Sequence, residues 1–497
     1  MSPVAAALAP ITAVEPRPDR IPLSFAQQRM WFINQFDPAA ATYNIPVGVR
    51  LTGDLDPVVL RAAAEDVMQR HEILRTTFPS ADGEPRQEIH DIEWAREHLD
   101  WGVVESAAEL ADAASRGFDV AREAAFRVRL FREADTEWVL LAVIHHIAGD
   151  GESMRPLISD LVTAYAARAA GATPQFAPME VQFADYAVWQ HEVLGDPKNE
   201  SSVAGRQLGY WAEQLADLPD VLELPADRPR PLVASPTGAA YPFEIPRDVS
   251  ARIEQVAADS GVTAFMVVHA ALSVLLARLS ATDDIAVATP IAGRGDRVLD
   301  PMVGMFVNTL VLRTKVGTFT TFTDLLDQVR RVDLEAFATA DVPFEAVVDA
   351  VATARSQAFA PLAQVMLTLV HTMADTTADE SVTVGDISVR PLEAPAVFAQ
   401  RDLSVNLEAV HGGAWTGSLV YATDLFDEST MAVFARRLVI LLDRLTEDTD
   451  GAVGLVGLLD DGERERLADW SAGAEMVVER RRITDASQVL RSKDDGN

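Results

Sequence analysis

Two adjacent histidines, an aspartate and a glycine are the residues of this chain whose types and spacing best suit catalysis. His145 and His146 end an apolar run, and Asp150 and Gly151 follow them in the stretch LLAVIHHIAGDG. Histidine titrates near neutral pH, so a histidine at such a position can accept or lend a proton in a cleft. Adjacent side chains in an extended run point to opposite faces, so one histidine would face the cleft while the other packs locally.

A structural interpretation of the same four residues is also open. Both histidines would then be hydrogen-bonded within the fold, Asp150 would cap the following helix, and Gly151 would permit a tight turn. The spacing alone does not decide between the catalytic and the structural interpretation.

A strand and a helix must position these residues. Residues 137–144 are an apolar run typical of a strand, and the apolar residues after the turn recur at helical spacing. That stripe consists of Met154, Leu157, Ile158, Leu161, Val162, Tyr165 and Ala166. Asp150 or Ser153 would cap the helix, and Pro156 fits only near its first turn. We therefore predict a strand-to-helix turn, where side chains and a helix N-terminus can meet a ligand.

The rest of the chain alternates between helical and strand patterns. The first half predicts strands at 43–52 and 125–131 and a helix at 57–70. A proline-rich connector at 224–237 follows. Beyond it, helices are predicted at 249–259, 263–279, 322–337 and 428–445, and strands at 285–289, 308–313, 365–370, 403–409 and 417–421. Both halves mix helices and strands, so the predicted fold class is α+β.

Composition excludes several classes of function. Half of the 497 residues are apolar, and 42 Lys and Arg face 75 Asp and Glu, a net charge of -33 that disfavours nucleic-acid and anionic-membrane surfaces. The absence of cysteine excludes disulfides, thiolate nucleophiles and cysteine-ligated zinc, and no histidine pattern predicts a metal site. No signal-like start is present and no stretch reaches the roughly 18 apolar residues of a membrane helix. We expect a soluble, cytoplasmic protein.

Further motifs follow one another along the chain in a recognisable order. His145, His146, Asp150 and Gly151 match an HHxxxDG pattern. The other segments are LSFAQQRMWFINQF (23–36), RHEILRTTF (70–78), VQFADYAVWQ (181–190), YWAEQLADLP (210–219), ATPIAGRGD (288–296), VGMFVNTLVLR (303–313) and PLAQVML (361–367). This set resembles the motifs of condensation domains of nonribosomal peptide synthetases, over about residues 21 to 470.

The resemblance implies two chloramphenicol-acetyltransferase-like lobes that form a V-shaped pseudo-dimer around a central tunnel. It implies a linker at 1–20, an N-terminal lobe at 21–190, a connector at 191–237, a C-terminal lobe at 238–457 and a tail at 458–497. The segment 288–308 would be the loop that bridges the lobes as the tunnel floor, and part of 380–425 would be the latch.

The same resemblance implies a reaction. The amine of an aminoacyl group on an acceptor carrier protein attacks the thioester of a donor carrier protein, which forms a peptide bond. Substrates arrive on the phosphopantetheine arms of the two peptidyl carrier proteins, so no cofactor or metal bound by the domain is expected. Residues 458–473 resemble the hinge toward a neighbouring adenylation domain. A monomer that binds carriers weakly is expected.

Residue roles also follow from the resemblance. His146 is the central residue, as a general base or as a group that positions the amine. His145 supports the turn, Gly151 brings backbone amides close to the thioester, and Asp150 pairs with Arg294 across the lobes. Residues in matching motifs that would support packing or the tunnel are Arg29, Arg75, Trp189, Asn308, Ser153 and Glu152, the last at a position where many relatives carry a bulky residue.

The subtype and two alternatives complete the hypothesis. All four motif positions are kept, and the flanking segments look like domains that join an L-configured donor to an L-configured acceptor (LCL). One alternative is a non-catalytic scaffold that docks carrier proteins or a tailoring enzyme. The other is an acyltransferase of the same superfamily that forms an ester.

Overall fold

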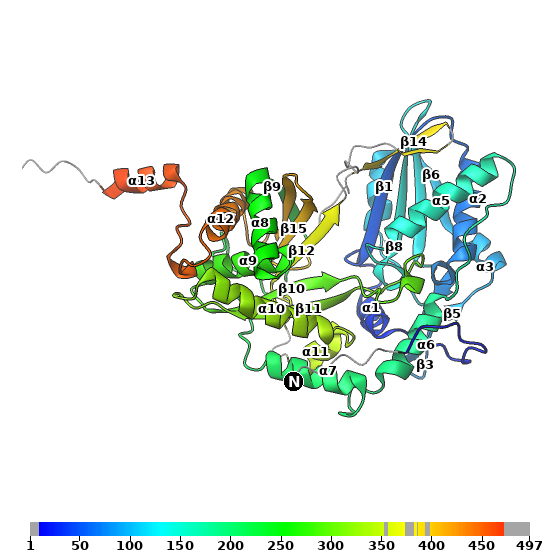
Figure 1. The fold of residues 1–497 in the computed structure, drawn as a ribbon. Coiled ribbons are helices and arrows are strands. Elements are labelled where there is room, and N and C mark those ends of the chain that lie inside the picture. The colour runs from blue at the N-terminus through cyan, green and yellow to red at the C-terminus, as the bar shows by residue number, and fades with distance from the viewer. Residues whose placement is uncertain (1–8, 352–355, 373–381, 385, 393–397, 472–497) are drawn as a thin grey trace, which may run out of the picture. The chain divides into compact units, whose positions relative to one another are not determined.

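The computed structural model describes residues 9–351, 356–372, 382–384, 386–392 and 398–471. Residues 1–456 belong to one compact unit and residues 457–497 to a second, in which α13 (Asp461–Ser471) is the described helix. Figure 1 shows the elements, and the first unit contains two six-stranded sheets. The mixture of helices and mixed sheets confirms the predicted α+β class.

The first sheet carries the histidine motif at the end of its central strand. Its strand order is β13 (Val382–Val384), β14 (Ile387–Leu392), β1 (Asn44–Thr52), β8 (Glu137–His145), β7 (Phe126–Arg132) and β6 (Asp100–Val104). The helices α2 (Pro57–Arg70) and α5 (Met154–Ala169) pack against each other over one face. The helix α4 (Ala107–Ser115) covers the other face, where the carbonyl of Ala113 accepts a hydrogen bond from Arg127.

The helix α5 forms where the apolar stripe predicts it. Leu157 and Tyr165 are buried, while Ala166 at the end of the predicted stripe is exposed and Ala164 is buried instead. Pro156 lies in the first turn, where its missing N–H costs no helix hydrogen bond. Of the two predicted capping residues, Asp150 forms a hydrogen bond at the start of the helix, because its carboxylate accepts from the backbone N–H of Ser153. The Ser153 side chain makes no capping hydrogen bond.

The second sheet has the order β11 (Asn308–Lys315), β10 (Asp284–Ile291), β12 (Val365–Thr372), β15 (Leu403–Val410), β16 (Trp415–Ala422) and β9 (Gly238–Ile245). Four helices accompany it: α8 (Arg247–Ser260), α9 (Ala264–Ser280), α10 (Phe322–Ala338) and α12 (Glu428–Glu447). Of these, α9 is the most deeply buried, in keeping with its nearly continuous apolar sequence.

Shorter elements connect and flank the two sheets. They are α1 (Phe25–Phe36), η1 (Glu72–Arg75), β2 (Thr76–Thr77), β3 (Ser80–Ala81), β4 (Glu84–Pro85), β5 (Glu88–Ile89), α3 (Ile92–His98), η2 (His146–Ala148), α6 (Phe183–Leu194), α7 (Val203–Gln214), η3 (Arg297–Leu299), α11 (Phe344–Val351) and η4 (Val453–Leu455). Elements that no sequence pattern predicted are α4, β6, β9, β13, β14 and several of these short elements.

Two segments of the second half complete the first half. The strand β14 pairs antiparallel with β1, from Gly48 opposite Leu392 to Thr52 opposite Ser388. Residues of the loop between β10 and β11 are buried in the core of the first sheet, namely Leu299, Met302, Val303, Met305 and Phe306. The strand β14 lies within the predicted latch region, and the loop lies within the predicted floor segment.

The segment 9–20, part of the predicted linker, contacts the first half of the chain. It contains no helix or strand, yet Ile11 is buried in the first core and Arg17 forms ion pairs with Asp185 and Glu72. The helix α6 runs to Leu194, so the predicted lobe boundary at residue 190 falls inside a helix. The division of the chain into lobes, connector and tail stays a prediction.

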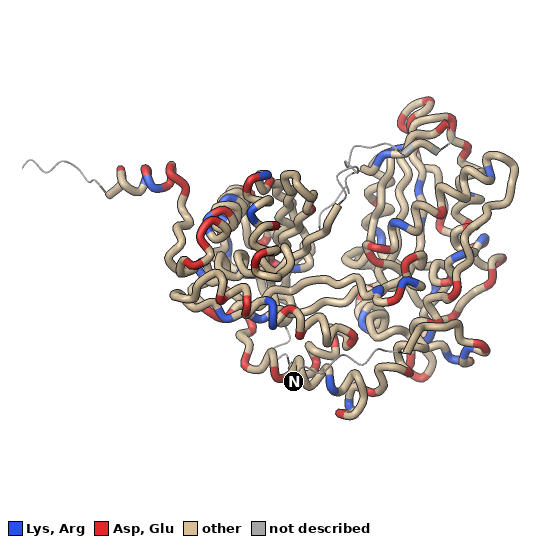
Figure 2. The backbone as a smooth tube through the Cα atoms, viewed as in Figure 1, with Lys and Arg blue, Asp and Glu red and all other residues tan. Residues whose placement is uncertain are grey.

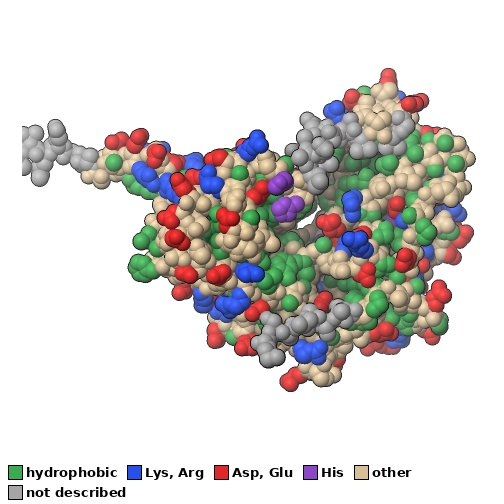
Figure 3. Space-filling view, in the orientation of Figure 1, with side chains coloured by type: hydrophobic (Ala, Val, Ile, Leu, Met, Phe, Trp, Pro, Cys, Tyr) green, Lys and Arg blue, Asp and Glu red, His purple; other side chains and the backbone are tan. Residues whose placement is uncertain are grey.

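Charge is distributed without a basic surface in the views shown. Acidic residues occur along both halves of the backbone tube (Figure 2), and Lys and Arg are scattered among Asp and Glu on the face in Figure 3. Within the described ranges, no single helix is long and apolar enough to cross a bilayer. The pair α8 and α9, bent by 108°, passes the length and composition test only when the two helices are taken together.

Candidate active site

His146 stands at the junction of β8 and the turn that leads to α5. Its backbone N–H donates a hydrogen bond of 2.8 Å to the carbonyl oxygen of Tyr43, which fixes the start of the turn against the beginning of β1. The side chain is half-buried, and its Nδ1 atom is enclosed without a hydrogen-bond partner among the described residues. The backbone of His146 is held in place, and the partly exposed ring leaves the imidazole available to a ligand.

His145 is enclosed on the α4 side of the sheet. Its Nδ1 accepts a hydrogen bond of 3.1 Å from the backbone N–H of Ile147, and its ring meets the edge of Phe118 at 6.1 Å between ring centroids. Burial, and secondarily the neighbouring His146, lowers the pKa of His145 to about 3. His145 is therefore neutral near pH 7 and holds the turn through its accepting nitrogen.

Asp150 connects the turn to the loop from the second half. It is buried, and its Oδ1 accepts hydrogen bonds from the Ser153 backbone N–H at 2.9 Å and the Ser153 hydroxyl at 2.7 Å. Its Oδ2 accepts from the backbone N–H groups of Phe306 at 2.9 Å and Val307 at 3.2 Å. A carboxylate that accepts from two chain segments at once fixes their relative position.

Arg294 supplies the positive charge beside this carboxylate. Its Nη2 lies 3.4 Å from Asp150 Oδ1 and 3.2 Å from Ser153 Oγ. Its Nη1 donates to the carbonyl oxygens of Leu299 and Met302, and the guanidinium lies over the Phe306 ring at 4.3 Å. The structure thus contains the Asp150–Arg294 pair that the resemblance suggested.

Gly151 and Glu152 are exposed at the tip of the turn. A Cβ atom on Gly151 would meet no atom within 4 Å, and its backbone is not left-handed. Nothing in the described fold therefore requires glycine at this position, whereas a ligand approaching the turn would gain the space that a side chain would occupy.

The other candidate residues form hydrogen bonds and ion pairs with groups other than the His146 ring. Arg29 on α1 pairs with Glu345 on α11 at 2.5 Å, and Arg75 donates to the carbonyl oxygens of Met68 and His90. Trp189 donates to the carbonyl oxygen of Ala9, and Asn308 donates to those of Ala340 and Val342. Trp189, Asn308 and Arg294 share the lining of one cavity with about 1520 Å³ of empty space, its open mouth included.

A polar cavity beside Tyr43 was not anticipated from the sequence. It contains about 880 Å³ of empty space on the same measure and is lined by Arg230, Arg401 and Asp402 among others. Arg230 pairs with Asp402 at 2.5 Å. Burial, and then the charge of Arg29, lowers the pKa of Arg401 to about 10. The Tyr43 carbonyl and the Phe306 and Val307 amides were also missed, because backbone groups carry no residue-type signal.

The fold and the histidine turn together define a class of two-sheet α+β acyltransferase. The family model for the condensation domain matches residues 18–468. The chain belongs to the condensation-domain family of nonribosomal peptide synthetases, whose members form amide bonds by acyl transfer.

Individual relatives agree with this assignment. The chain is 44% identical over 467 residues to a probable non-canonical nonribosomal peptide synthetase, CymA, of Salinispora arenicola, covering 92% of this chain and 6% of the relative. It is 41% identical over 470 residues to a dimodular nonribosomal peptide synthase of Bacillus subtilis, covering 93% and 20%. The chain thus spans a fifth or less of these two curated relatives.

Solved structures show the same fold. The X-domain in the complex of the X-domain and OxyB from teicoplanin biosynthesis is 31% identical, with a TM-score of 0.82 and coverage of 92% of this chain and 99% of that chain. A four-domain nonribosomal peptide synthetase bound to AMP and glycine matches at 22% identity and a TM-score of 0.78, covering 90% and 34%, which shows the fold alone.

Proposed function

We propose that this chain joins a donor acyl thioester to the amine of an acceptor aminoacyl thioester, and that His146 is its catalytic residue. The observation that carries the proposal is the half-buried His146 ring on a turn held by three surrounding contacts. These contacts are the Tyr43 carbonyl, the His145 nitrogen and the Asp150 carboxylate. A positioned histidine contributes typically 10² to 10⁴ in rate through proton transfer.

The chemistry balances without a cofactor of the domain. The acceptor amine attacks the donor carbonyl carbon, a C–N bond forms, and the C–S bond to the donor arm breaks. One proton leaves the nitrogen and one reaches the departing thiolate, and a neutral imidazole can accept the first and return it. His146 acts on the amine either by removing its proton or by accepting a hydrogen bond that orients it.

The partners belong to the same proposal. Donor and acceptor peptidyl carrier proteins would present their phosphopantetheine arms, and an adenylation domain would neighbour the chain, in keeping with the multidomain relatives. The LCL subtype is part of the same proposal, and the segments that support it are YNIP (43–46) and DGESMRPLISDL (150–161), which flank the motif. Asp150, Arg294 and Ser153 would be positioning residues, because their contacts hold the turn and the loop.

Transfer between loaded carriers tests the proposal. Intact-protein mass spectrometry should show the donor acyl mass added to the aminoacyl acceptor carrier with the wild type. We expect His146→Ala to slow this transfer at least a hundredfold. His411→Ala is the matched control, since His411 is exposed on the second half and pairs only with Glu254 among the described residues. Equal rates for both variants would remove His146 from the mechanism.

A glutamine variant separates the two forms of the His146 role. Proton removal predicts a His146→Gln variant as slow as His146→Ala, because glutamine has no basic nitrogen. Orientation predicts partial rescue by glutamine, whose carbonyl oxygen accepts a hydrogen bond. In both forms the variants should bind the carriers as the wild type does.

A scaffold function is the second candidate, because the X-domain in the teicoplanin structure was solved in complex with OxyB. A scaffold would bind loaded carriers without transferring acyl groups from any of them. Supplying amine and alcohol acceptors in parallel tests the ester-forming alternative in the same assay.

A further inference from the structure

The residues before the first helix pack against the helix α6. Residues 9–17, here called the N-terminal strap, contain no helix or strand. Ile11 is buried in the first core, and the carbonyl oxygen of Ala9 accepts a hydrogen bond of 2.8 Å from the Trp189 indole on α6. These contacts make the strap part of the folded body.

Arg17 joins the strap to the start of α6 and to η1. Its Nε and Nη2 atoms lie 2.7 Å and 3.0 Å from the two carboxylate oxygens of Asp185, and its Nη1 lies 2.6 Å from Glu72 Oε2. The backbone N–H of Val14 also donates to Asp185, at 3.3 Å. Only 2% of the Asp185 side chain is exposed, so its charge requires these donors. A two-point pair of this kind fixes the orientation of both partners.

The two ends of α6 have different anchors. Toward its C-terminus, Gln190 accepts a hydrogen bond of 3.0 Å from the backbone N–H of Phe25, and His191 Nε2 lies 2.9 Å from the carbonyl oxygen of Leu23. The first turn contains Asp185 and is the part that Arg17 holds. A change in the strap therefore acts chiefly on this first turn.

The first turn of α6 packs against the loop between β10 and β11. The Phe183 ring meets the Phe306 ring at 5.1 Å between centroids, and the Tyr186 ring meets it at 4.8 Å. A Cβ atom on Gly304 would lie 2.1 Å from the Phe183 ring, so the loop backbone lies directly against this ring. Displacement of Phe183 therefore displaces the loop.

A large cavity borders the same loop. Gly293, Arg294 and Gly295 line this cavity together with Ala9 and Pro10 of the strap, and its empty space is about 1520 Å³ with the open mouth included. Unfilled space beside a segment removes packing contacts that would otherwise hold it. The position of the loop therefore depends on its contacts with α6.

Two loop residues that contact α6 also hold the histidine turn. The backbone N–H of Gly304 donates to Ser153 Oγ at 3.1 Å, and the backbone N–H of Phe306 donates to Asp150 Oδ2 at 2.9 Å. The strap, α6, the loop and the turn are thus joined by consecutive contacts.

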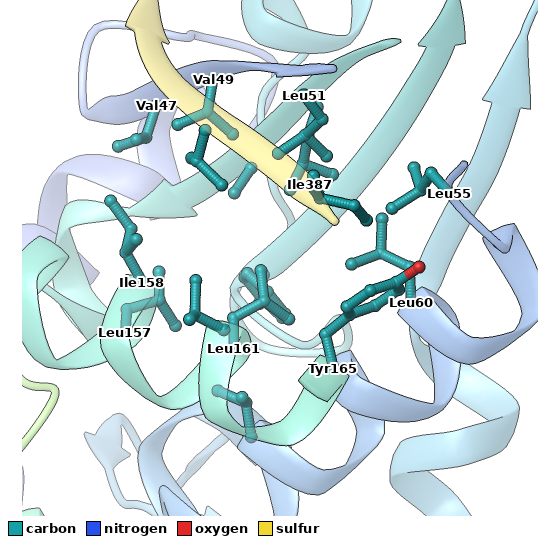
Figure 4. A pocket seen from close by; sticks show the side chains of 16 residues that line it. Val47, Val49, Leu51, Leu55, Leu60, Leu157, Ile158, Leu161, Tyr165 and Ile387 are labelled. Carbon is teal, nitrogen blue, oxygen red and sulfur yellow. The ribbon is translucent and has the colours of Figure 1, made fainter. Parts of the chain in front are cut away.

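The helix that follows the turn contributes non-directional contacts. The helix α5 lies on the first sheet through apolar side chains, and Figure 4 shows Leu157 and Leu161 directed toward the side of Val47 and Val49 on β1. Apolar packing is non-directional and tolerates small displacements. Directional hydrogen bonds from the loop therefore determine where the turn, and with it His146, lies.

We propose that Arg17 and Asp185 are positioning residues of the acyl-transfer reaction, which act on His146 through Phe183 and Phe306. The inference rests on the proposed function, since it concerns the rate of that reaction. The ion pair fixes the start of α6, the helix fixes the loop, and the loop fixes the turn. A misplacement of about 1 Å at a reacting group can lower a rate about a hundredfold, so a small shift of α6 has a measurable effect.

Variants of Arg17 test the inference. We expect Arg17→Ala to lower kcat for transfer between loaded carriers about tenfold, while KM for each carrier stays within about twofold. Arg17→Lys should not restore the rate, because one ammonium group cannot bind Asp185 at two points and Glu72 as well. Arg20→Ala is the matched control, because Arg20 is 60% exposed and lies 3.8 Å from an exposed Glu84. Equal kcat values for Arg17→Ala and Arg20→Ala, with both proteins folded, would overturn the inference.

A double-mutant cycle tests the route through α6. Phe183→Leu should also lower kcat, because the shorter side chain no longer supports the loop. If Arg17 acts through Phe183, the double variant should lose no more than about threefold beyond the larger single loss. Losses that multiply, or an unchanged kcat in Phe183→Leu, would overturn the route.

Hydrogen exchange measures the same coupling without the reaction. In Arg17→Ala, the peptides that contain Phe306 and Val307 should exchange about fivefold faster or more, while those of β15 and β16 stay within about twofold of the wild type. Faster exchange in a protein that transfers no acyl group would support the coupling and place the failure in the proposed function. Exchange of the loop at the wild-type rate would overturn the inference.

Discussion

Asp150 holds two chain segments together and has a structural rather than a chemical role in this structure. Each of its oxygen atoms is committed, one to Ser153 and one to the backbone amides of Phe306 and Val307, and Arg294 lies beside them. A carboxylate with this many donors is poorly placed to exchange protons with a substrate. Its effect on catalysis is therefore expected to pass through the position of the turn.

Replacing this carboxylate should cost stability. In Asp150→Asn the side-chain NH2 group would face the backbone N–H groups that now donate to the carboxylate. Arg294 would also lose the negative charge beside it. We therefore expect the free energy of unfolding to fall by about 2–4 kcal/mol. Urea denaturation measures the change. Asp135→Asn is the control, because Asp135 pairs with Arg132 at the surface and its side chain is fully exposed. A similar small effect for both substitutions would show that the buried network contributes little.

His145 should make stability depend on pH in the acid range. Its pKa is depressed to about 3 in the folded state by burial and by His146, against about 6.5 when unfolded. The unfolded state therefore binds more protons between these values. The contribution of neutral His145 is fully present above pH 6.5 and is lost as the pH falls toward 3, by at most about 1.4 kcal/mol per pH unit.

Asparagine at position 145 removes this titration and keeps an acceptor for the Ile147 N–H. We expect the stability of His145→Asn to fall less steeply than that of the wild type between pH 6 and pH 4 in urea titrations. Parallel curves for the two proteins would mean that His145 is not the group whose protonation destabilises the fold.

The loop between β10 and β11 is the element whose shape the site depends on. It carries Arg294, buries Met302 and Phe306 in the core of the first sheet, and offers two backbone N–H groups to Asp150. Gly293 starts this excursion with a φ of +64°, and a Cβ there would lie 1.9 Å from the carbonyl oxygen of Phe306. Only glycine satisfies both conditions.

Two glycine substitutions in this loop should differ in their effect on stability. Gly293→Ala should destabilise the chain by about 2 kcal/mol or more and slow acyl transfer, because the backbone must shift under Asp150. Gly295→Ala, two residues away, meets no atom within 4 Å and has no left-handed backbone, so it should change stability by less than about 0.5 kcal/mol. Thermal unfolding and transfer assays on both variants check this, and equal behaviour would show that the loop shape is not critical.

Sequence patterns predicted the regular elements where the signal is local. The strands β1 and β8 lie within one residue of their predicted bounds, and α5 begins where its apolar stripe begins, at Met154, and ends three residues beyond it. The strand β14 escaped prediction because its stability comes from pairing with β1, hundreds of residues earlier, and its short sequence ISVRPL contains a proline.

The candidate site was likewise predictable from the sequence only in part. Residue types drew attention to His145, His146 and Asp150, and family resemblance pointed to Arg294. The amides of Ile147, Phe306 and Val307 hold the side chains of His145 and Asp150, and the carbonyl of Tyr43 holds the backbone of His146. Backbone groups are present at every position, so only the folded arrangement singles out these four.

The whole first unit is one interdependent body, because the core of the first sheet is incomplete without residues of the second half. Leu299, Met302 and Phe306 fill that core, Ile387 closes its edge, and Arg29 pairs with Glu345 across the two halves. Each half alone would expose the apolar surface that the other covers.

Cutting the connector tests this interdependence. Leu232 and Val233 are 92% and 61% exposed, so limited proteolysis should cleave there first. We expect the two fragments to migrate together in size-exclusion chromatography and to separate only in denaturant, since β14 and the loop remain in place. Separation of the fragments under native conditions would show that the connector holds the halves together.

The borrowed strand β14 also has a consequence for how the chain is made. A ribosome delivers β1, β8 and α5 long before it delivers Ile387, at about 5–20 residues per second. For roughly ten to forty seconds the nascent chain therefore carries the histidine motif beside an open sheet edge. During that interval any other strand or apolar segment can pair there first, so the yield of native protein depends on what shields this edge until residues 387–392 emerge.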